Sequence, residues 1–218
     1  MRIEHIWPLS GIEDLPMGGK GLDVASVRII RDRWADTLGT LLDSAALSMF
    51  NERLHREWAI ETGRIENLYD IEQGVTVSLI EYGFEAALIP PGSVNRDPEY
   101  VLRLLNDQAS ALEGLFAFVK QDRSLSISFI RELHQVMTAS QESVTVSDPQ
   151  GKRFETELLK GQWKKHPNYP QRDGREFRYC PPEHVAAEMG RLIEMHLSHV
   201  DVSPEVEAAW LPHRFAQI

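Results

Sequence analysis

The sequence is short of three things, and each shortage excludes a class of protein. It has one cysteine, Cys180, so no disulfide can form within the chain, and a reducing compartment such as the cytoplasm is expected. It has no apolar run of about 20 residues, the length a helix needs to cross a bilayer, so we expect no membrane partner. Basic residues are also outnumbered: 23 Lys and Arg stand against 33 Asp and Glu, and the formal net charge is −10. Since phosphates are bound by clustered Lys and Arg, this acidic balance argues against a nucleic-acid partner.

The sequence is rich in the apolar periodicity that is typical of helices. Its 218 residues suit one domain, or one domain with a small appendage. Apolar residues recur at helical spacing from residue 41 onward, and Asp43 or Ser44 is a candidate cap for this first helix. The same pattern predicts further helices over 76–84, 98–119, 126–137, 182–196 and 203–218. The expected fold class is therefore mainly α.

Residues 1–40 lack that pattern. Pro8, Pro16 and the glycine-rich run at 18–21 interrupt the first part of this segment, where no apolar periodicity is present. We therefore expect residues 1–40 to form an irregular N-terminal arm.

A second change of composition occurs over residues 141–181, where Ser, Gln, Asp, Gly, Pro and Asn are frequent. Residues 161–164 and 176–179 are expected to form the two arms of a β-hairpin about residues 170–174. Cys180 follows this hairpin, and we expect it to pack in the core because no basic residue is placed to activate its thiol.

Four segments, in chain order, carry a resemblance to one protein family. Residues 208–218 are similar to the helix that leads into HPFxxGNGR, the signature of the Fic family of protein-AMPylating enzymes. Glu132-Leu133-His134 resembles the helix ahead of the family's flap, a hairpin that docks the target protein. Lys160-Gly161-Gln162-Trp163-Lys164 resembles the opening of that flap, and residues 179–185 resemble its exit. The resemblance covers roughly residues 40–218.

A fifth segment resembles the family's inhibitory pattern, Ser/Thr-x-x-x-Glu-Gly/Asn. Thr62-Gly63-Arg64-Ile65-Glu66-Asn67 matches all three specified positions. The resemblance implies that Glu66 pairs with the last Arg of the signature and competes with the ATP γ-phosphate for its guanidinium. It also implies that Thr62 orients the helix end by hydrogen bonding and that Asn67 ends the turn in a left-handed conformation. The alternative for Glu66 is a surface glutamate at a helix end.

The resemblance implies a Fic-fold helical bundle with three parts. Residues 1–40 are the arm, 41–75 the inhibitory helix region, and 76–218 the N-terminal part of the Fic core, with the flap at 151–181. The implied activity is transfer of AMP from ATP to a hydroxyl of an unknown target protein, with ATP and Mg²⁺ as cofactors. The implied role of Gly161, Gln162, Trp163 and Lys164 is to dock the target segment as an added strand. Related proteins often form homodimers, so the resemblance also allows a homodimer.

The sequence contains no HPFxxGNGR, so we expect no catalytic residue, no metal ligand and no activity from the chain as printed. Two interpretations follow. The chain is a truncated piece of an AMPylating enzyme, or it is a natural non-catalytic Fic remnant that acts as a helical protein-interaction module. A final helix with a start signal and no stop signal favours truncation. Pro212, which should kink that helix, favours the remnant.

The histidines offer one further candidate site. His196 and His199 are three residues apart and share a helical face, which suits two ligands of a metal ion. A zinc site would need a third protein ligand, and His196 continues an apolar stripe. A hydrogen-bonded histidine in the core or at an interface is therefore the favoured interpretation.

Overall fold

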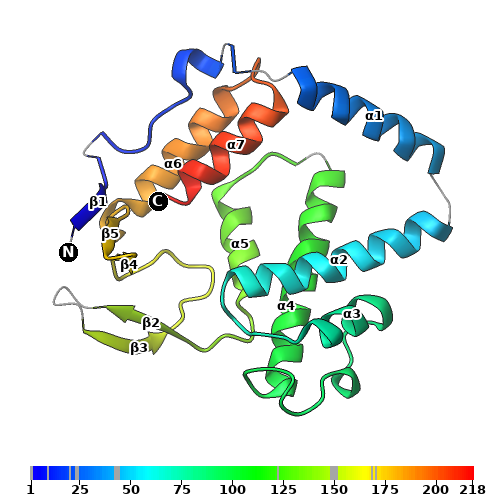
Figure 1. Ribbon diagram of the computed structural model, residues 1–218. Helices are drawn as coiled ribbons and strands as arrows, with labels where there is room; N and C mark the ends of the chain where they lie inside the picture. The colour runs from blue at the N-terminus through cyan, green and yellow to red at the C-terminus, as the bar shows by residue number, and fades with distance from the viewer. Residues whose placement is uncertain are drawn as a thin grey trace. The chain divides into compact units, whose positions relative to one another are not determined.

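A computed structural model of the chain describes residues 2–8, 10–19, 21–22, 25–41, 45–121, 123–147, 152–167, 169 and 171–218. Over these residues the chain is mainly helical, as predicted, with two small β-sheets (Figure 1). Its internal contacts divide it into two compact units. Unit 1 comprises Met1–Arg33, Leu125–Ile127 and Ser143–Ile218, and unit 2 comprises Trp34–Ser124 and Ser128–Glu142.

Unit 2 consists of helices around an apolar core. It contains α2 (Ala45–Ile65), α3 (Gln73–Tyr82), the short 3-10 helix η2 (Ala86–Leu88) and α4 (Pro98–Lys120). It also contains α5 (Ile127–Met137), except for the first residue of that helix. α2 packs along α4, and both His55 and Trp58 stack on Phe116, with ring centroids 4.5 and 5.9 Å apart. The buried core side chains are Ile60, Tyr69, Ile71, Val75, Leu79, Ile89, Val101, Leu104 and Leu105. Helices were predicted over the regions of α2, α3, α4 and α5, and these four predictions are confirmed.

α4 shows how a sequence signal becomes a helix start. The Asp97 carboxylate accepts a hydrogen bond from the Tyr100 backbone N–H at 2.9 Å, and Pro98 occupies the first helical position. Such a cap satisfies a backbone donor that the helix leaves unpaired, and it stabilises a helix by about 1 kcal/mol. The cap predicted for α2, Asp43 or Ser44, lies outside the described residues.

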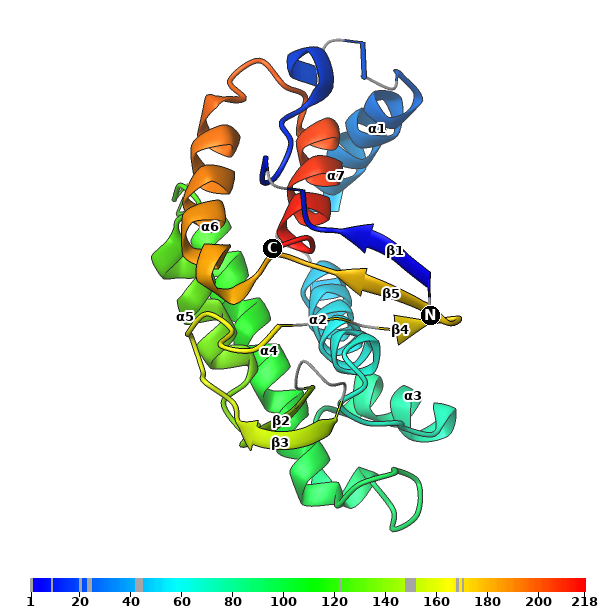
Figure 2. The ribbon, with the colours of Figure 1, turned by 90° about the vertical axis from the view of Figure 1, so that its left-hand side faces the viewer.

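Unit 1 contains α6 (Pro182–Ser198), α7 (Pro204–Phe215), the first part of α1 (Ala25–Leu41) and the two sheets. α6 and α7 pack against each other. Figure 2 shows β1 (Arg2–Ile6), β5 (Arg175–Arg178) and β4 (Gln171–Arg172) side by side, in that order. β1 is parallel to β5, and β4 is antiparallel to it. The second sheet is an antiparallel hairpin of β2 (Ser143–Ser147) and β3 (Arg153–Glu157), with Ser143 opposite Glu157. A 3-10 helix, η1 (Pro16–Gly19), lies near the start of the chain.

The prediction of an irregular arm over 1–40 is wrong for two parts of that segment. Residues 2–6 form β1, and Ala25–Leu41 form the helix α1, which crosses from unit 1 to unit 2. Every α1 side chain that the structure describes is exposed. Apolar periodicity reports a buried helical face, so a helix that buries little of its surface does not show it. β1 escaped prediction because its partner, β5, lies more than 170 residues later in the sequence.

The predicted hairpin is half right. β5 begins at Arg175, close to the predicted second arm, but it pairs with β4 and β1, and residues 161–164 form no strand. Asp173 and Gly174 both have positive φ, 53° and 73°, which is the type I′ geometry that joins two strands with a two-residue turn. Asp-Gly is a strong signal for that turn, so the hairpin closes there and leaves 161–164 as a loop. Pro170, part of the predicted turn region, lies outside the described residues.

The helices of unit 1 follow the prediction more closely. α6 and α7 were both expected, and Pro212 lies inside α7, which continues to Phe215. Within the described ranges of the chain, no helix is long and apolar enough to span a membrane.

Candidate functional site

The C-terminal end of α2, which carries the inhibitory pattern, is a fully formed helix stop. Asn67 has φ 54°, and its N–H donates to Arg64 O at 3.0 Å. Leu68 N–H donates to Gly63 O at 2.9 Å. Together these two bonds form a Schellman motif, which satisfies carbonyls that a helix end would leave unpaired. Asn67 therefore ends the helix in a left-handed conformation, as predicted.

Thr62 and Glu66 take different positions around this stop. The Thr62 hydroxyl donates to Trp58 O at 2.8 Å, one turn back in α2, and not to the residues after the helix. Its backbone carbonyl accepts the Glu66 N–H at 3.1 Å. The Glu66 side chain is exposed, and its carboxylate makes no hydrogen bond or ion pair with the part of the chain that the structure describes. Glu66 thus presents a free carboxylate from a fixed backbone.

Gly63 explains how this helix end is anchored. A β-carbon at Gly63 would lie 2.2 Å from the Tyr69 hydroxyl oxygen, so only glycine allows the approach. Tyr69 is 1% exposed, and its hydroxyl lies 3.3 Å from both Ala59 O and Ile60 O, to which it can donate. Burial raises the pKa of Tyr69 well above its usual 10.0, so the phenol stays a neutral donor. The segment after the helix is therefore held back against α2.

In unit 1, the four predicted flap residues lie in a loop that packs on the unit's core. Gln162 N–H donates to Leu159 O at 3.1 Å and closes a tight turn, in which Gly161 is buried with φ 64°. Trp163 is half-buried and packs against the core cluster. Gln162 is exposed, and Lys164 is half-buried. These residues form a docked turn and not a free strand edge.

This loop meets the end of α7. Lys164 Nζ donates to the backbone oxygen of Ile218 at 2.7 Å, and Cys180 N–H donates to Gln217 O at 3.1 Å. Residues 160–164, 179–185 and 208–218 were singled out by resemblance at three separate places in the sequence. The structure brings them to one place in unit 1.

Burial shifts the pKa values of two side chains at this junction. Burial lowers the pKa of Lys164 below 10.5, although nearby Cys180 acts in the opposite direction. Burial raises the pKa of Cys180 to about 11, and Lys164 opposes that rise. The thiol is therefore protonated at neutral pH and only 1% exposed, which confirms that Cys180 is a packing residue.

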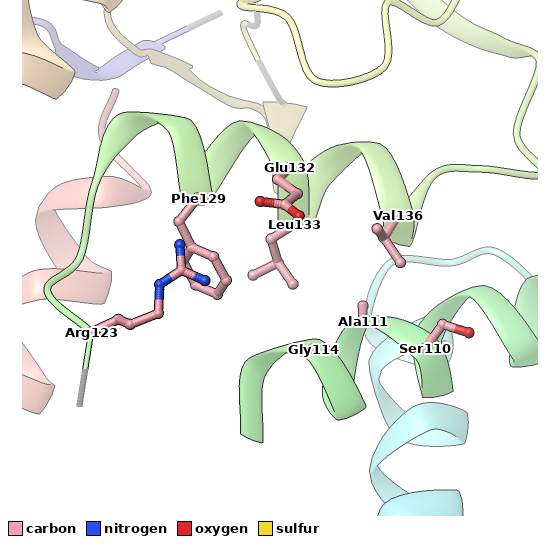
Figure 3. Close-up of a pocket in the computed structure, with 8 residues that line it drawn as sticks. All are labelled: Ser110, Ala111, Gly114, Arg123, Phe129, Glu132, Leu133 and Val136. Carbon is pink, nitrogen blue, oxygen red and sulfur yellow. The ribbon is translucent and has the colours of Figure 1, made fainter. Parts of the chain in front are cut away.

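Glu132 and Leu133, from the remaining segment of the resemblance, line a small cavity in unit 2 (Figure 3). Leu133 points from α5 toward α4, where Ser110 and Ala111 lie. The cavity has a volume of about 100 Å³. Pockets that enclose drug-sized or cofactor-sized ligands measure roughly 300–1,000 Å³, so this cavity is too small for a nucleotide.

The residues that the structure describes form no site for the Mg²⁺ that the resemblance implies. Among the described residues, no group of three or more His, Cys, Asp or Glu side chains could hold a metal ion such as Mg²⁺. The sequence also has no HPFxxGNGR loop with which to bind the phosphates of ATP.

The two histidines of α6 belong to a cluster that the sequence only partly revealed. His196 Nδ1 lies 2.6 Å from Glu207 Oε1, so His196 is a hydrogen-bonded histidine, as favoured above. His199 Nδ1 lies 2.7 Å from Glu207 Oε2, and His199 Nε2 lies 2.7 Å from Asp14 Oδ1. Glu207 and Asp14 were not predicted, because they lie on α7 and near residue 15, and no spacing rule connects them to α6.

The chain was compared with protein families, curated proteins and solved structures. No protein-family model matches the sequence, and neither a curated protein nor a solved structure matches it significantly.

Proposed function

We propose that this chain forms the regulatory and target-docking part of a Fic-type AMPylating protein. The single observation that carries the proposal is the meeting of three segments at the end of α7. The predicted flap opening, the flap exit and the helix that precedes the signature in the family are linked there by Lys164–Ile218 and Cys180–Gln217 hydrogen bonds. These segments are far apart in sequence, so their meeting is independent of the pattern that singled them out.

The position of Glu66 supports an inhibitory role for it. A helix C-terminus carries a partial negative charge, so a carboxylate there opposes the helix dipole, by about 0.3–1 kcal/mol for a surface group. Glu66 follows the last residue of α2, Ile65, and therefore gives the fold no stability through the dipole. The backbone that carries this carboxylate is fixed by a Schellman motif and by the Gly63–Tyr69 contact, so the carboxylate is displayed to a cation from outside this segment. An arginine that otherwise binds the ATP γ-phosphate is such a cation.

The proposed role for 161–164 is target docking beside the α7 junction. Gln162 is exposed there, between the buried Gly161 and the half-buried Trp163. A loop fixed by its neighbours loses little freedom when it binds, which favours recognition of an extended segment. Catalysis itself requires residues that the printed sequence does not contain, and we assign no catalytic residue to it.

The proposal is tested by AMP transfer in the protein expressed from its full natural coding sequence. ATP labelled at the α-phosphate is supplied with Mg²⁺, and label is measured on the protein itself and on proteins of the source cell. We expect Glu66→Gly and Glu66→Gln to increase the label. The matched control is Glu57→Gln, an exposed glutamate on the same helix, which should leave it unchanged. Absence of label from every variant, or an equal increase in the control, contradicts the proposal.

A second candidate function is a non-catalytic interaction module. Large apolar side chains are exposed on α1 and α2, among them Ile30 at 66%, Trp34 at 57% and Met49 at 57%. A contiguous patch of exposed apolar residues is typical of protein-binding surfaces, and these two helices carry the side chains from which a patch can be built. Magnesium-dependent ATP binding by the full protein separates the two candidates, because an interaction module does not require it.

A further inference from the structure

The cluster of His199, Asp14 and Glu207 in unit 1 has an unusual geometry. His199 is the C-cap of α6, its side chain is 5% exposed, and the Trp210 ring packs edge-on against it with centroids 4.7 Å apart. Both of its ring nitrogens face carboxylate oxygens at 2.7 Å: Glu207 from α7 on one side and Asp14 from the N-terminal segment on the other.

This geometry fixes the number of protons on His199. A neutral imidazole carries one N–H and one lone pair, so it can donate to only one of the two carboxylates. The second nitrogen would then place its lone pair 2.7 Å from an ionised oxygen, which is repulsive. When both carboxylates are ionised, both contacts are favourable together only if His199 is the doubly protonated imidazolium.

The directions in which the pKa values of His199 and Asp14 are shifted agree with a doubly protonated His199. Burial alone would lower the pKa of His199, but the hydrogen bonds and charges of Asp14 and Glu207 outweigh it and raise the pKa above 6.5. Burial alone would raise the pKa of Asp14, but the bond to His199 and other contacts lower it below 3.8. The contribution of His199 is thus complete below pH 6.5 and lost as pH rises through its folded pKa. The contribution of Asp14 is complete above pH 3.8 and lost as pH falls through its folded pKa, so the contact is strongest between these two values.

Asp14 is the partner that neutral His199 would release. Glu207 is 14% exposed in its side chain and is also held by His196, whereas Asp14 is 52% exposed. The other charged groups around Asp14 are Arg191 of α6, which lowers its pKa, and Arg214 of α7, which lies 3.6 Å from Glu13. Neither replaces the contact with the histidine.

The segment that Asp14 belongs to, residues 10–15, lies along α6 and α7. Glu188 of α6 accepts the Ile12 N–H at 2.9 Å, Arg191 donates to Ser10 O, and Trp210 of α7 donates to Glu13 O at 3.3 Å. Ile12 and Leu15 are buried in the core cluster of unit 1 with Leu192 and Trp210. Residues 10–15 therefore cover an apolar surface of the helix pair, and the histidine contact is one of several attachments that keep them there.

We propose that His199, Asp14 and Glu207 form a pH-sensitive latch that holds residues 10–15 on α6 and α7 in mildly acidic solution and loosens them as pH rises. Loss of the proton from His199 breaks the contact with Asp14 and leaves the contact with Glu207. The segment then opens more often and exposes the apolar surface beneath Ile12 and Leu15.

The test is hydrogen exchange of the backbone amides of residues 10–15 in the full chain, corrected for intrinsic exchange rates. We expect their protection to fall between pH 6 and pH 8, by at most about tenfold per pH unit, because one proton is linked to the opening. Asp14→Asn and His199→Gln should each reduce protection at pH 6 and remove most of its pH dependence. His184→Gln, which removes an exposed histidine of α6, is the matched control and should behave as the unmodified chain.

A second measurement keeps the proposal decidable if a variant does not fold. Nitrogen NMR of the unmodified chain should show both ring nitrogens of His199 protonated at pH 6, and Asp14→Asn should lower the pH at which the proton is lost. A neutral His199 at pH 6, or protection of residues 10–15 that is the same at pH 6 and pH 8, overturns the proposal. Equal pH dependence in His199→Gln and the unmodified chain overturns it as well.

Discussion

The end of α2 in unit 2 and the end of α7 in unit 1 were both singled out by the sequence, but they are built in different ways. At the end of α2, the hydrogen bonds that form the helix stop join residues within ten positions of each other, from Ala59 to Tyr69. At the end of α7, Lys164 and Ile218 are 54 positions apart. A local structure of the first kind can be inferred from residue types alone, whereas the second requires the rest of the fold.

The two cores show the same contrast. The core of unit 2 runs from Ile60 to Leu105, so it is assembled from consecutive helices. The core of unit 1 includes both Ile12 and Ile218, which brings the beginning and the end of the printed sequence together. Contacts between distant residues must overcome a larger loss of chain entropy before they form. The following predictions test this difference, from the largest expected effect to the smallest.

The largest effect is expected from removing a buried leucine in either core. Leu104 is 1% exposed in unit 2, and Leu192 is 0% exposed in unit 1. Leu104→Ala and Leu192→Ala should each lower the free energy of unfolding by about 2–5 kcal/mol, because each leaves a cavity in a packed core. Chemical denaturation measures the loss. Leu197→Ala, at a leucine of α6 that is 55% exposed, is the control, and a similar loss there would contradict the assignment of Leu192 to the core.

The next largest effect concerns the local contact at the end of α2. Gly63→Ala places a methyl group against the Tyr69 hydroxyl and should destabilise the chain by about 1–3 kcal/mol, the usual cost of overpacking. Gly190→Ala in α6 meets nothing within 4 Å and should stabilise the chain by about 0.5–1 kcal/mol, because alanine favours a helix. Thermal unfolding of both variants gives the comparison. A neutral Gly63→Ala would show that Tyr69 does not anchor the helix end.

A smaller effect is expected at Asn67, which has φ 54°. Asn67→Ala should lower the free energy of unfolding by about 1 kcal/mol, since a β-carbon is disfavoured in the left-handed region. Asn67→Gly should equal or exceed the stability of the unmodified chain. Calorimetry of the pair isolates the backbone conformation from any effect of the side-chain amide. Equal stability of the alanine and glycine variants would contradict the Schellman geometry.

The smallest effect is a change in pH dependence at the end of α7. Because the folded pKa of Lys164 is lowered, the unfolded chain binds more protons as pH approaches 10.5, and stability should rise with pH in that range. Lys164→Met should reduce this rise. Lys165→Met changes an exposed neighbour and is the control. Denaturation at pH 8 and pH 10 measures the slope, and an unchanged slope in Lys164→Met would show that burial does not affect this lysine.

The sequence predicted those elements whose signals are local. The helix cap at Asp97-Pro98, the apolar stripe of α4 and the stop at Asn67 each depend on a few neighbouring residues, and all three are confirmed. The predictions of a strand at 161–164 and of an irregular segment in parts of residues 1–40 were wrong, because these structures depend on residues distant in the sequence or on helices without a buried face. β5 takes β1 and β4 as partners, and α1 forms without a buried face to mark it.

The sequence by itself therefore determined the mainly helical class, the position of most helices and the left-handed stop that displays Glu66. Hydrogen bonding within one or two helical turns specifies these features. Tertiary structure alone decided that Lys164 and Cys180 meet the end of α7, and that Asp14 meets His199 from 185 positions away. These contacts depend on how distant segments pack around a shared apolar core, and packing of that kind leaves no periodic trace in the residues that make it.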